Sequence, residues 1–309
     1  MARLPTITSA PGKLFLFGEY AVLSGGRAIV TAVDRRVFAT RHLNRTHYRA
    51  HGTKGLELPR FVLEATGSTA TIEHLETDVR ALFEGSTKLG LGSSAASAVA
   101  LCAAVLVHDE GGRFDRDDVF RAASMAHRLL QQGLGSGGDV ACATYGGTLA
   151  YSMSDPRLPL STPPIAVRPI WTGESASSTV LVRGVEEARA IRSEEVDRAL
   201  TQIADVAENA VRVMEVGAWS ELPELVALGD EAMERLGLVS QATIITDRHR
   251  TLRKVALRHG AVVKPSGAGG GDFSLAVGTD VDWQAFRAQL PVGCRMMELE
   301  LGAEGVRVE

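Results

Sequence analysis

The sequence predicts an α+β protein of two domains, and three observations lead to this prediction. At 309 residues, the chain exceeds the length that one hydrophobic core usually serves. Strand-like and helical segments are mixed without the regular alternation of a doubly wound sheet. A proline-rich stretch at residues 156–164 separates two halves of different texture. We therefore expect one domain over residues 1–160 and a second over residues 161–309.

The first half is predicted to begin with strands and to continue with helices. Runs of apolar residues, continuous or alternating, predict strands at 13–17, 28–42, 78–83 and 145–151. The segment 28–42 is expected to form one strand or two. The polar residues 44–58 are expected to form a loop or an edge. Apolar residues at helical spacing predict helices at 96–108 and 116–131.

The second half is expected to contain longer helices and short strands. Spaced apolar residues opposite a charged face predict helices at 186–216, 222–236, 246–259 and 282–290. Apolar runs predict strands at 166–171, 179–182, 261–264, 273–277 and 295–301.

Composition and charge argue against several classes of protein. Apolar residues make up 45% of the chain and charged residues 23%, which is ordinary for a soluble globular protein. The net charge of −4 gives no basic field for nucleic acid. The start, Met1 to Pro5, has no apolar leader, and no apolar run approaches the ~18 residues of a membrane span. Cys102, Cys142 and Cys294 lack C-x-x-C spacing and are expected to be reduced, packed thiols in the cytoplasm.

The most informative segment is the glycine- and serine-rich loop Gly90–Ala96, which is predicted to open into a helix. Glycines let a backbone approach a ligand closely, and the first N–H groups of a helix lack partners within it. Together with the helix dipole, these N–H groups favour phosphate. The loop has neither the P-loop pattern nor the dinucleotide-binding fingerprint. A tight turn with a serine cap is the alternative.

The same residues also imitate a nucleophile elbow. Gly92-Ser-Ser-Ala-Ala96 follows G-x-S-x-G, with alanine in the last place. A serine hydrolase with Ser94 as its nucleophile is therefore the distant alternative function.

Two further glycine-rich loops carry charged residues. Gly133–Gly138 precedes Asp139, which is expected either to cap a helix beginning at Val140 or to orient the hydroxyl of an acceptor. Lys264-Pro-Ser-Gly-Ala-Gly-Gly-Gly-Asp272 lies between two predicted strands. Lys13 and Glu19 flank an early apolar strand and are expected to face one cleft. Three such loops favour a site that handles phosphate over three unrelated turns.

With these motifs in order, the sequence resembles the GHMP kinases. The resemblance rests on Pro11–Glu19, Gly90–Ala96 and Ser266–Gly271, and it extends from about Thr8 to Val277. It implies an N-terminal domain similar to ribosomal S5 domain 2, a ferredoxin-like C-terminal domain, and ATP with Mg²⁺ as cofactors. A small-molecule acceptor is implied, without nucleic acid or membrane as partner, in a monomer or a homodimer.

Within the family, the chain is most similar to the phosphomevalonate kinases. Trp171-Thr-Gly-Glu-Ser-Ala-Ser-Ser-Thr179 resembles their W-T-G-x-x-A-S-T signature, and Tyr20 stands where mevalonate kinases commonly have histidine. His127 also fits that subfamily. Arg128 occupies the position of the metal-binding glutamate of mevalonate kinases. We therefore expect phosphorylation of (R)-5-phosphomevalonate to 5-diphosphomevalonate, with mevalonate phosphorylation as the alternative.

The resemblance also assigns roles to individual residues. It implies that Lys13 and Asp139 are catalytic and that Ser94 and Glu19 lie at the metal. It implies that ATP is bound by Gly90, Leu91, Gly92, Ser93, Ser94 and Ala95. From charge and position we expect the acceptor to be bound by Lys88, Ser136, Ser177, Ser178, Gly269 and Asp272.

Overall fold

The structure is a computed structural model that describes residues 5–43, 49–51, 55–155 and 157–309. The chain divides into two compact units, and each unit combines separate stretches of sequence. Unit 1 contains residues 1–14, 31–149 and 300–309, and unit 2 contains residues 15–30 and 150–299. The units interleave along the chain, whereas the sequence predicted contiguous domains. Part of the polar stretch 44–58, Pro156 and the start of the chain fall outside the described residues.

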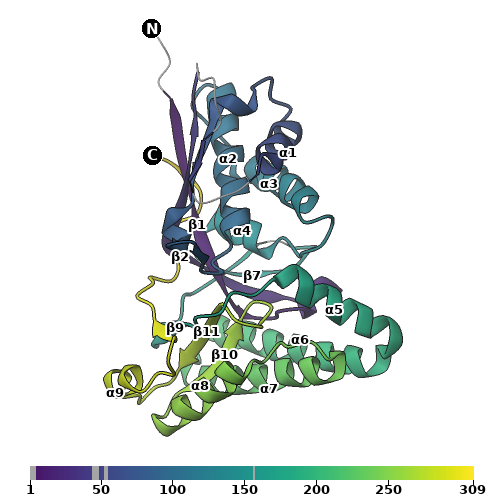
Figure 1. Ribbon diagram of the computed structural model, residues 1–309, viewed down its shortest axis with the longest axis vertical. Coiled ribbons are helices and arrows are strands. Elements are labelled where there is room, and N and C mark those ends of the chain that lie inside the picture. Colours follow the sequence, from purple (N-terminus) through teal and green to yellow (C-terminus); the bar gives the residue numbers. More distant parts are fainter. Residues whose placement is uncertain (1–4, 44–48, 52–54, 156) are drawn as a thin grey trace. The chain divides into compact units, whose positions relative to one another are not determined.

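A mixed β-sheet with helices along one face forms unit 1 (Figure 1). Its strands follow the order β13-β1-β2-β4-β3, and β7 pairs with β2 and with β8. β3 and β4 run parallel, while β1–β13 and β2–β4 are antiparallel. The strands of the sheet are β1 (Thr6–Phe17), β2 (Ala28–Arg41), β3 (Arg49–His51), β4 (Leu75–Asp78), β7 (Thr148–Tyr151), β8 (Leu158–Leu160) and β13 (Arg307–Val308). Of these, β8 belongs to the stretch of sequence that is counted with unit 2.

The helices of unit 1 surround one central helix. α2 (Ser93–Asp109) is rich in alanine and buried on nearly every side, because it packs against the other three helices of this group. These are α1 (Glu57–Thr66), α3 (Arg116–Leu130) and α4 (Gly138–Tyr145). Small side chains allow this close approach, which brings the N-termini of α2 and α4 into the same region as α3. The predicted helices at 96–108 and 116–131 are confirmed.

The strand predicted at 78–83 is wrong. β4 ends at Asp78, and Arg80–Leu82 forms a turn of 3₁₀-helix. The carboxylate of Asp78 accepts a hydrogen bond from the backbone N–H of Arg80 at 3.0 Å and also pairs with the Arg80 guanidinium. Such local bonds from an aspartate compete with a strand ladder and turn the chain. A short hairpin follows, formed by β5 (Phe83–Glu84) and β6 (Thr87–Lys88).

The segment 300–309 completes unit 1, and a buried arginine attaches it to the sheet. Arg36 on β2 donates to the carbonyl oxygens of Glu304 and Gly305, each at 2.7 Å, and to the carbonyl of Ser9 at 3.0 Å. Val306 donates its backbone N–H to the carbonyl of Thr144 at 3.1 Å. The sheet of unit 1 therefore includes residues from the first and the last stretches of the chain.

Unit 2 is an antiparallel four-stranded sheet with a layer of helices. The strand order is β10-β11-β9-β12, and α7 and α8 pack against β10 while α6 packs against α7 (Figure 1). The strands are β9 (Val167–Trp171), β10 (Val262–Ser266), β11 (Phe273–Val277) and β12 (Arg295–Met296). The helices are α5 (Ser178–Ile191), α6 (Ser193–Val216), α7 (Leu222–Ser240), α8 (Asp247–Arg258) and α9 (Trp283–Ala288). Short 3₁₀ turns lie at Ala21–Ser24 and Trp219–Glu221 in unit 2, and another lies at Ile72–His74 in unit 1.

Two expectations for unit 2 are wrong. Residues 179–182, expected as a strand, form the first turns of α5. Val182, Val185 and Ala188 recur at a spacing of three and pack on one side, so the helical period outweighs the β-branched composition. The closing strand expected at 295–301 is reduced to two residues in β12 and an isolated bridge from Leu301 to Val33.

The three cysteines are free and buried, as the sequence predicted. Burial raises the pKa of the Cys102 and Cys142 thiols well above the ordinary value, so little thiolate forms at neutral pH. We expect iodoacetamide to leave both cysteines unmodified in the native protein and to alkylate them after unfolding in urea. Peptide mass spectrometry measures both states, and rapid native alkylation of Cys102 or Cys142 would contradict the packing of α2 and α4.

Within the described residues, no helix combines the length and apolar character needed to cross a membrane.

Candidate active site

The loop Gly90–Ala96 lies in unit 1 and forms the N-terminus of α2, as expected. Gly92 precedes the helix in the left-handed conformation, with a φ of 74°, and no side chain caps the helix among the residues that the structure describes. The backbone N–H groups of the first turn therefore face outward with the positive end of the helix dipole. This arrangement suits the phosphates of a nucleotide.

Lys13 on β1 is attached directly to this loop. Its backbone N–H donates to the carbonyl of Leu91 at 3.0 Å, and its Nζ donates to the carbonyl of Gly90 at 3.4 Å. The aliphatic stem of Lys13 runs across Gly92, where a Cβ would lie 3.0 Å from Cγ and 3.1 Å from Cε of the lysine. Position 92 therefore requires glycine both for its φ and for the passage of Lys13.

Asp139 lies in the first turn of α4, which begins at Gly138 rather than at Val140. Its Oδ1 accepts a hydrogen bond from the backbone N–H of Val140 at 3.0 Å. Its Oδ2 lies 4.0 Å from Nε2 of His127, and the side chain of Asp139 remains 20% exposed. One hydrogen bond therefore holds the carboxylate, its other oxygen faces the imidazole of His127, and part of it still meets solvent.

Lys13 and Asp139 both lie close to Cys142 on α4. Burial is the main cause of the raised pKa of this thiol, but the ammonium of Lys13 lowers that pKa and the carboxylate of Asp139 raises it further. Both charges therefore act on the same thiol, with the opposite signs expected of a cation and an anion. The two residues expected to be catalytic thus lie in the same part of unit 1, around Cys142.

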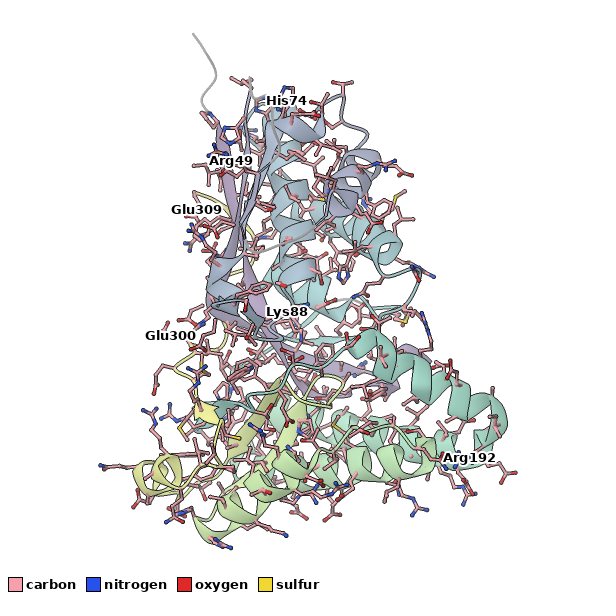
Figure 2. The ribbon with its side chains drawn as sticks, viewed as in Figure 1. Arg49, His74, Lys88, Arg192, Glu300 and Glu309 are labelled. Atoms are coloured by element: carbon pink, nitrogen blue, oxygen red, sulfur yellow. The ribbon has the colours of Figure 1, made fainter. Side chains whose placement is uncertain are left out.

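Two residues expected to bind the acceptor also belong to unit 1. Lys88 ends β6, two residues before the loop, and its side chain is exposed (Figure 2). Ser136 accepts the backbone N–H of Gly138 at 3.2 Å through its Oγ. Ser136 therefore helps to begin α4, which is a structural role, and substrate binding by either residue stays a prediction.

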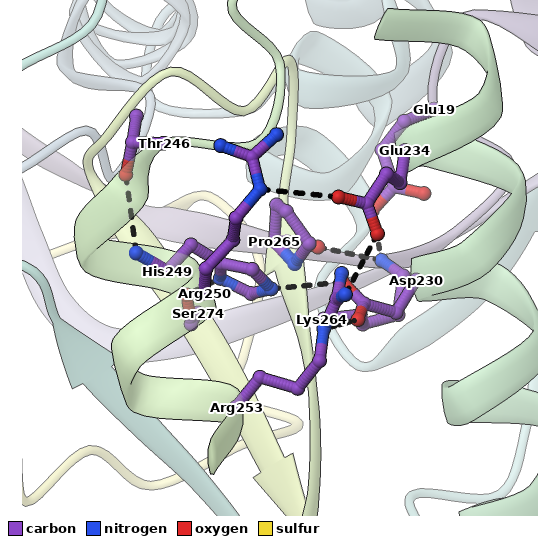
Figure 3. Close-up of polar contacts among 10 residues, drawn as sticks. All are labelled: Glu19, Asp230, Glu234, Thr246, His249, Arg250, Arg253, Lys264, Pro265 and Ser274. Carbon is purple, nitrogen blue, oxygen red and sulfur yellow. Dashed lines mark hydrogen bonds and ion pairs between the residues drawn. The ribbon is translucent and has the colours of Figure 1, made fainter. Parts of the chain in front are cut away.

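The other predicted site residues belong to unit 2, where Glu19 has a partner that the sequence did not suggest. Lys264 donates to the Oε1 of Glu19 and to the carbonyl of Pro265, and the two charged side chains are only 1% and 2% exposed (Figure 3). The backbone N–H of Gly267 also approaches Oε1, at 3.5 Å. A role for Glu19 at the metal stays a prediction, because here its carboxylate is enclosed by Lys264 and the third loop.

Further contacts attach the third glycine-rich loop to residues 15–20. The Tyr20 hydroxyl donates to the carbonyl of Ala268 at 2.6 Å, and the Ser266 hydroxyl donates to the carbonyl of Phe15 at 2.9 Å. Burial, together with the charge of Glu19, raises the pKa of Tyr20 above its ordinary value, so the phenol stays a donor at neutral pH. Residues 15–20 and the third motif therefore form one connected structure within unit 2.

Asp272 joins this loop to the segment that carries Ser177 and Ser178. Its backbone N–H donates to the carbonyl of Glu174 at 2.7 Å, and its Oδ1 accepts the N–H of Ala176 at 3.4 Å. Ser177 precedes α5 without capping it through its own side chain, and Ser178 is the first residue of that helix. Gly269 has a φ of 77°, and a Cβ there would collide with the carbonyl of Ile244. Four of the predicted acceptor residues thus belong to one connected part of unit 2.

A buried polar network supports β11 just beyond this loop. His249 on α8 contacts Ser274 on β11 through Nδ1 and Asp230 on α7 through Nε2, each at 2.8 Å (Figure 3). Nε of Arg253 lies 2.6 Å from Oδ2 of Asp230, and hydrogen bonds from Arg253 lower the pKa of the neighbouring Glu234. Ser274, His249 and Asp230 are 1–3% exposed. The network resembles a hydrolase triad in its bonds, but its burial makes it a structural support for the strand.

His127 and Lys264 are the site residues that sequence reasoning did not assign. The Oγ of Ser94 lies 3.2 Å from Nε2 of His127, which is only 3% exposed. The signal for His127 was present, because position 127 falls on the same face of α3 as Val119, Ala123 and Ala126. A histidine within an apolar stripe needs a polar partner. Lys264 was visible as the charged residue that begins the third loop, but nothing in the sequence indicated that Glu19 is its partner.

Comparisons with known proteins show the family to which the chain belongs. The sequence profile described as the GHMP kinases N terminal domain matches residues 60–147. The chain is 32% identical to a mevalonate kinase of Archaeoglobus fulgidus, over 98% of this chain and 99% of that protein. It is 30% identical to a phosphomevalonate kinase of Streptomyces sp. (strain CL190), over 88% of this chain and 89% of that protein. The chain belongs to the GHMP kinase family.

A solved structure agrees with the fold of this GHMP kinase. The complex of Streptococcus pneumoniae phosphomevalonate kinase with phosphomevalonate and AMPPNP has a TM-score of 0.77 at 21% identity, covering 97% of this chain and 100% of that chain. The predicted α+β, two-domain GHMP kinase architecture is confirmed. The GHMP kinase described here is an ATP-dependent kinase.

Proposed function

We propose that this GHMP kinase transfers the γ-phosphoryl group of ATP to the phosphate of (R)-5-phosphomevalonate, giving 5-diphosphomevalonate and ADP. The observation that carries the kinase chemistry is the arrangement in unit 1. Lys13 lies against the uncapped N-terminus of α2, and Asp139 is held nearby with part of its carboxylate exposed. Phosphoryl transfer needs alignment and charge neutralisation, and these groups supply both.

In this reaction an oxygen of the acceptor phosphate attacks the γ-phosphorus, and the bond from that phosphorus to the bridging oxygen of ADP breaks. A phosphate monoester is already largely ionised at neutral pH, since its second pKa is about 6. The acceptor therefore brings no hydroxyl proton that must be removed. Asp139 then serves chiefly to orient Lys13 and the acceptor, while Lys13 and the loop N–H groups stabilise charge on the phosphates.

The residues present fit a magnesium ion bound mainly through the nucleotide. Mg²⁺ commonly keeps several waters and takes one or two protein ligands together with substrate phosphates. Among the described residues no cluster of three or more His, Cys, Asp or Glu side chains could hold a metal, whereas the Ser94 hydroxyl stands at the start of α2 beside the expected phosphates. Ser94 would hold the ion, which would neutralise charge on the β- and γ-phosphates.

The choice of acceptor rests on sequence features within the family. The relatives include both phosphomevalonate kinases and mevalonate kinases at similar identity. The Trp171–Thr179 signature and Arg128 favour the phosphorylated acceptor. The structure adds that the neighbour of Ser94 on α3 is the imidazole of His127, whereas the side chain of Arg128 is exposed. Mevalonate kinase remains the alternative, and the buried, free thiols support the expected cytoplasmic location.

The serine hydrolase alternative loses support from the geometry around Ser94. In a hydrolase triad the two ring nitrogens of histidine serve two different partners. Here the single Nε2 of His127 faces both Ser94 and Asp139, at 3.2 and 4.0 Å. This arrangement orients two groups toward a common ligand and provides no relay for activating the serine.

The proposal is tested by measuring ADP release with Mg·ATP and three acceptor conditions in parallel: 5-phosphomevalonate, mevalonate and no acceptor. We expect turnover with 5-phosphomevalonate alone. Turnover with mevalonate alone would establish the alternative. Turnover with neither acceptor would refute both substrates while leaving the family membership intact.

Replacing Lys88 by alanine tests the recognition of the acceptor phosphate. We expect Lys88→Ala to raise the KM for 5-phosphomevalonate by about tenfold, the effect of losing one charge-assisted hydrogen bond, and to leave the KM for ATP unchanged. Lys254→Ala, which removes an exposed lysine of α8 in unit 2, is the matched control and should change neither constant. An unchanged acceptor KM in Lys88→Ala would remove Lys88 from the substrate site.

A further inference from the structure

His127 is a buried histidine that the phosphoryl-transfer scheme above does not use. It lies in α3, on the face that packs into unit 1 together with Val119, Ala122, Ala123 and Ala126. Only 3% of its side chain is exposed. Its Nε2 reaches between the N-termini of α2 and α4, where Ser94 and Asp139 stand. Burying an imidazole at such a position costs free energy unless its nitrogen atoms make hydrogen bonds.

The neighbours of Nε2 indicate which tautomer is present. A bare nitrogen lone pair would face the negative charge of Asp139 at 4.0 Å, which is unfavourable. A proton on Nε2 interacts favourably with the carboxylate and donates to the Oγ of Ser94 at 3.2 Å. We therefore assign the proton to Nε2 of His127, and the Oγ of Ser94 accepts the hydrogen bond from it.

With this tautomer of His127, the orientations of the Ser94 hydroxyl and of the Asp139 carboxylate are both restricted. When Ser94 accepts from His127, its hydroxyl proton and its second lone pair turn away from the imidazole. Asp139 receives the N–H of Val140 at Oδ1, at 3.0 Å, while Oδ2 faces His127. The hydrogen bond holds Oδ1, and the electrostatic attraction between Oδ2 and the N–H of His127 favours one orientation of the carboxylate before substrate binds.

We propose that His127 is a positioning residue for phosphoryl transfer, orienting the Ser94 hydroxyl and the Asp139 carboxylate through one nitrogen. The inference rests on the proposed function, since it assumes that these two groups act on the phosphates. His127 itself touches neither ATP nor the acceptor in this scheme. It acts through the two residues that do.

The test compares two substitutions that differ in one N–H group. His127→Leu keeps an apolar side chain of comparable size but removes the donor, whereas His127→Gln restores an amide N–H near the position of Nε2. We expect His127→Leu to lower kcat by about 30-fold, as loss of a group that orients a ligand typically does, with the KM for ATP within about threefold. His127→Gln should recover most of the lost kcat.

Two further measurements separate positioning from a purely structural role. For the double variant His127→Leu/Ser94→Ala we expect a kcat within about threefold of that of the slower single variant. Both substitutions remove the same hydrogen bond between His127 and Ser94, so their effects should not add. Calorimetric binding of Mg·AMPPNP should persist in His127→Leu, since the loop N–H groups remain. Ser124→Ala is the control on the same helix, because its buried hydroxyl has no hydrogen-bond partner among the described residues.

The outcomes also distinguish this inference from the proposed function. If wild-type protein releases no ADP with 5-phosphomevalonate, the proposed function fails. If the wild type is active and His127→Leu keeps its kcat, the positioning role fails alone. Equal losses in His127→Leu and His127→Gln, accompanied by a lowered melting temperature, would assign His127 to the hydrophobic core and overturn the proposal.

Discussion

Asp139→Asn is expected to lower kcat by about 1,000-fold while ATP still binds. The substitution keeps the shape of the side chain and the bond from the N–H of Val140 to Oδ1, but it removes the negative charge. Without that charge the ammonium of Lys13 loses a nearby negative charge, and we expect its alignment with the phosphates to weaken. Steady-state kinetics should show the loss in kcat, with the KM for ATP within about threefold because the loop N–H groups are untouched.

Asp118→Asn is the matched control for this experiment. Asp118 is an aspartate of the same unit, but its side chain is 41% exposed and pairs with Arg121 on the surface of α3. We expect its kcat to equal that of the wild type. Full kcat in Asp139→Asn would remove Asp139 from the reaction, whereas loss of nucleotide binding would mean that the substitution had disrupted the loop instead.

The second large effect concerns the buried pair of Glu19 and Lys264. Replacing either partner alone should lower the free energy of unfolding by about 3–5 kcal/mol, because an uncompensated charge stays in the core. Lys264→Met isolates the Glu19 carboxylate, and Glu19→Leu isolates the Lys264 ammonium. Urea denaturation followed by fluorescence measures both losses.

The double variant Glu19→Leu/Lys264→Met distinguishes a charge effect from simple loss of packing. With both charges gone, the loss in the free energy of unfolding should be smaller than for either single variant. Arg27→Ala provides the control, since its pair with Glu208 is 40% and 47% exposed and contributes at most about 1 kcal/mol. Additive losses in the double variant would show that the pair does not carry the stability of the third loop.

Much of the fold follows from local patterns. The helical spacing in residues 116–130 and the apolar run of β11 each match an element of the structure. The prediction fails where a side chain acts on its own backbone, as Asp78 does at Arg80, and where β-branched residues such as Thr179 begin an amphipathic helix. At both places the composition of the segment favours a strand. A hydrogen bond to the backbone produces a 3₁₀ turn at the first, and the helical period of the apolar residues produces a helix at the second.

The parts of the candidate site that lie within continuous sequence motifs could be predicted from the sequence. Lys13, the loop Gly90–Ala96 and Asp139 each stand beside glycines that mark them. The pairing of Glu19 with Lys264 joins residues 245 positions apart, and no local pattern reveals such a contact. His127 is an intermediate case. The sequence shows that it lies among the apolar residues of a helix, but it does not show which polar groups it contacts.

The attachment of residues 300–309 by Arg36 has a consequence for how the protein is made. The strand that pairs with β1 and the carbonyls that receive Arg36 are synthesised last among these residues. Until they are made, the sheet of unit 1 that carries Lys13 lacks the edge strand beside β1. We expect unit 1 of a growing chain to become protease-resistant only once residues 300–309 have left the ribosome and paired with β1.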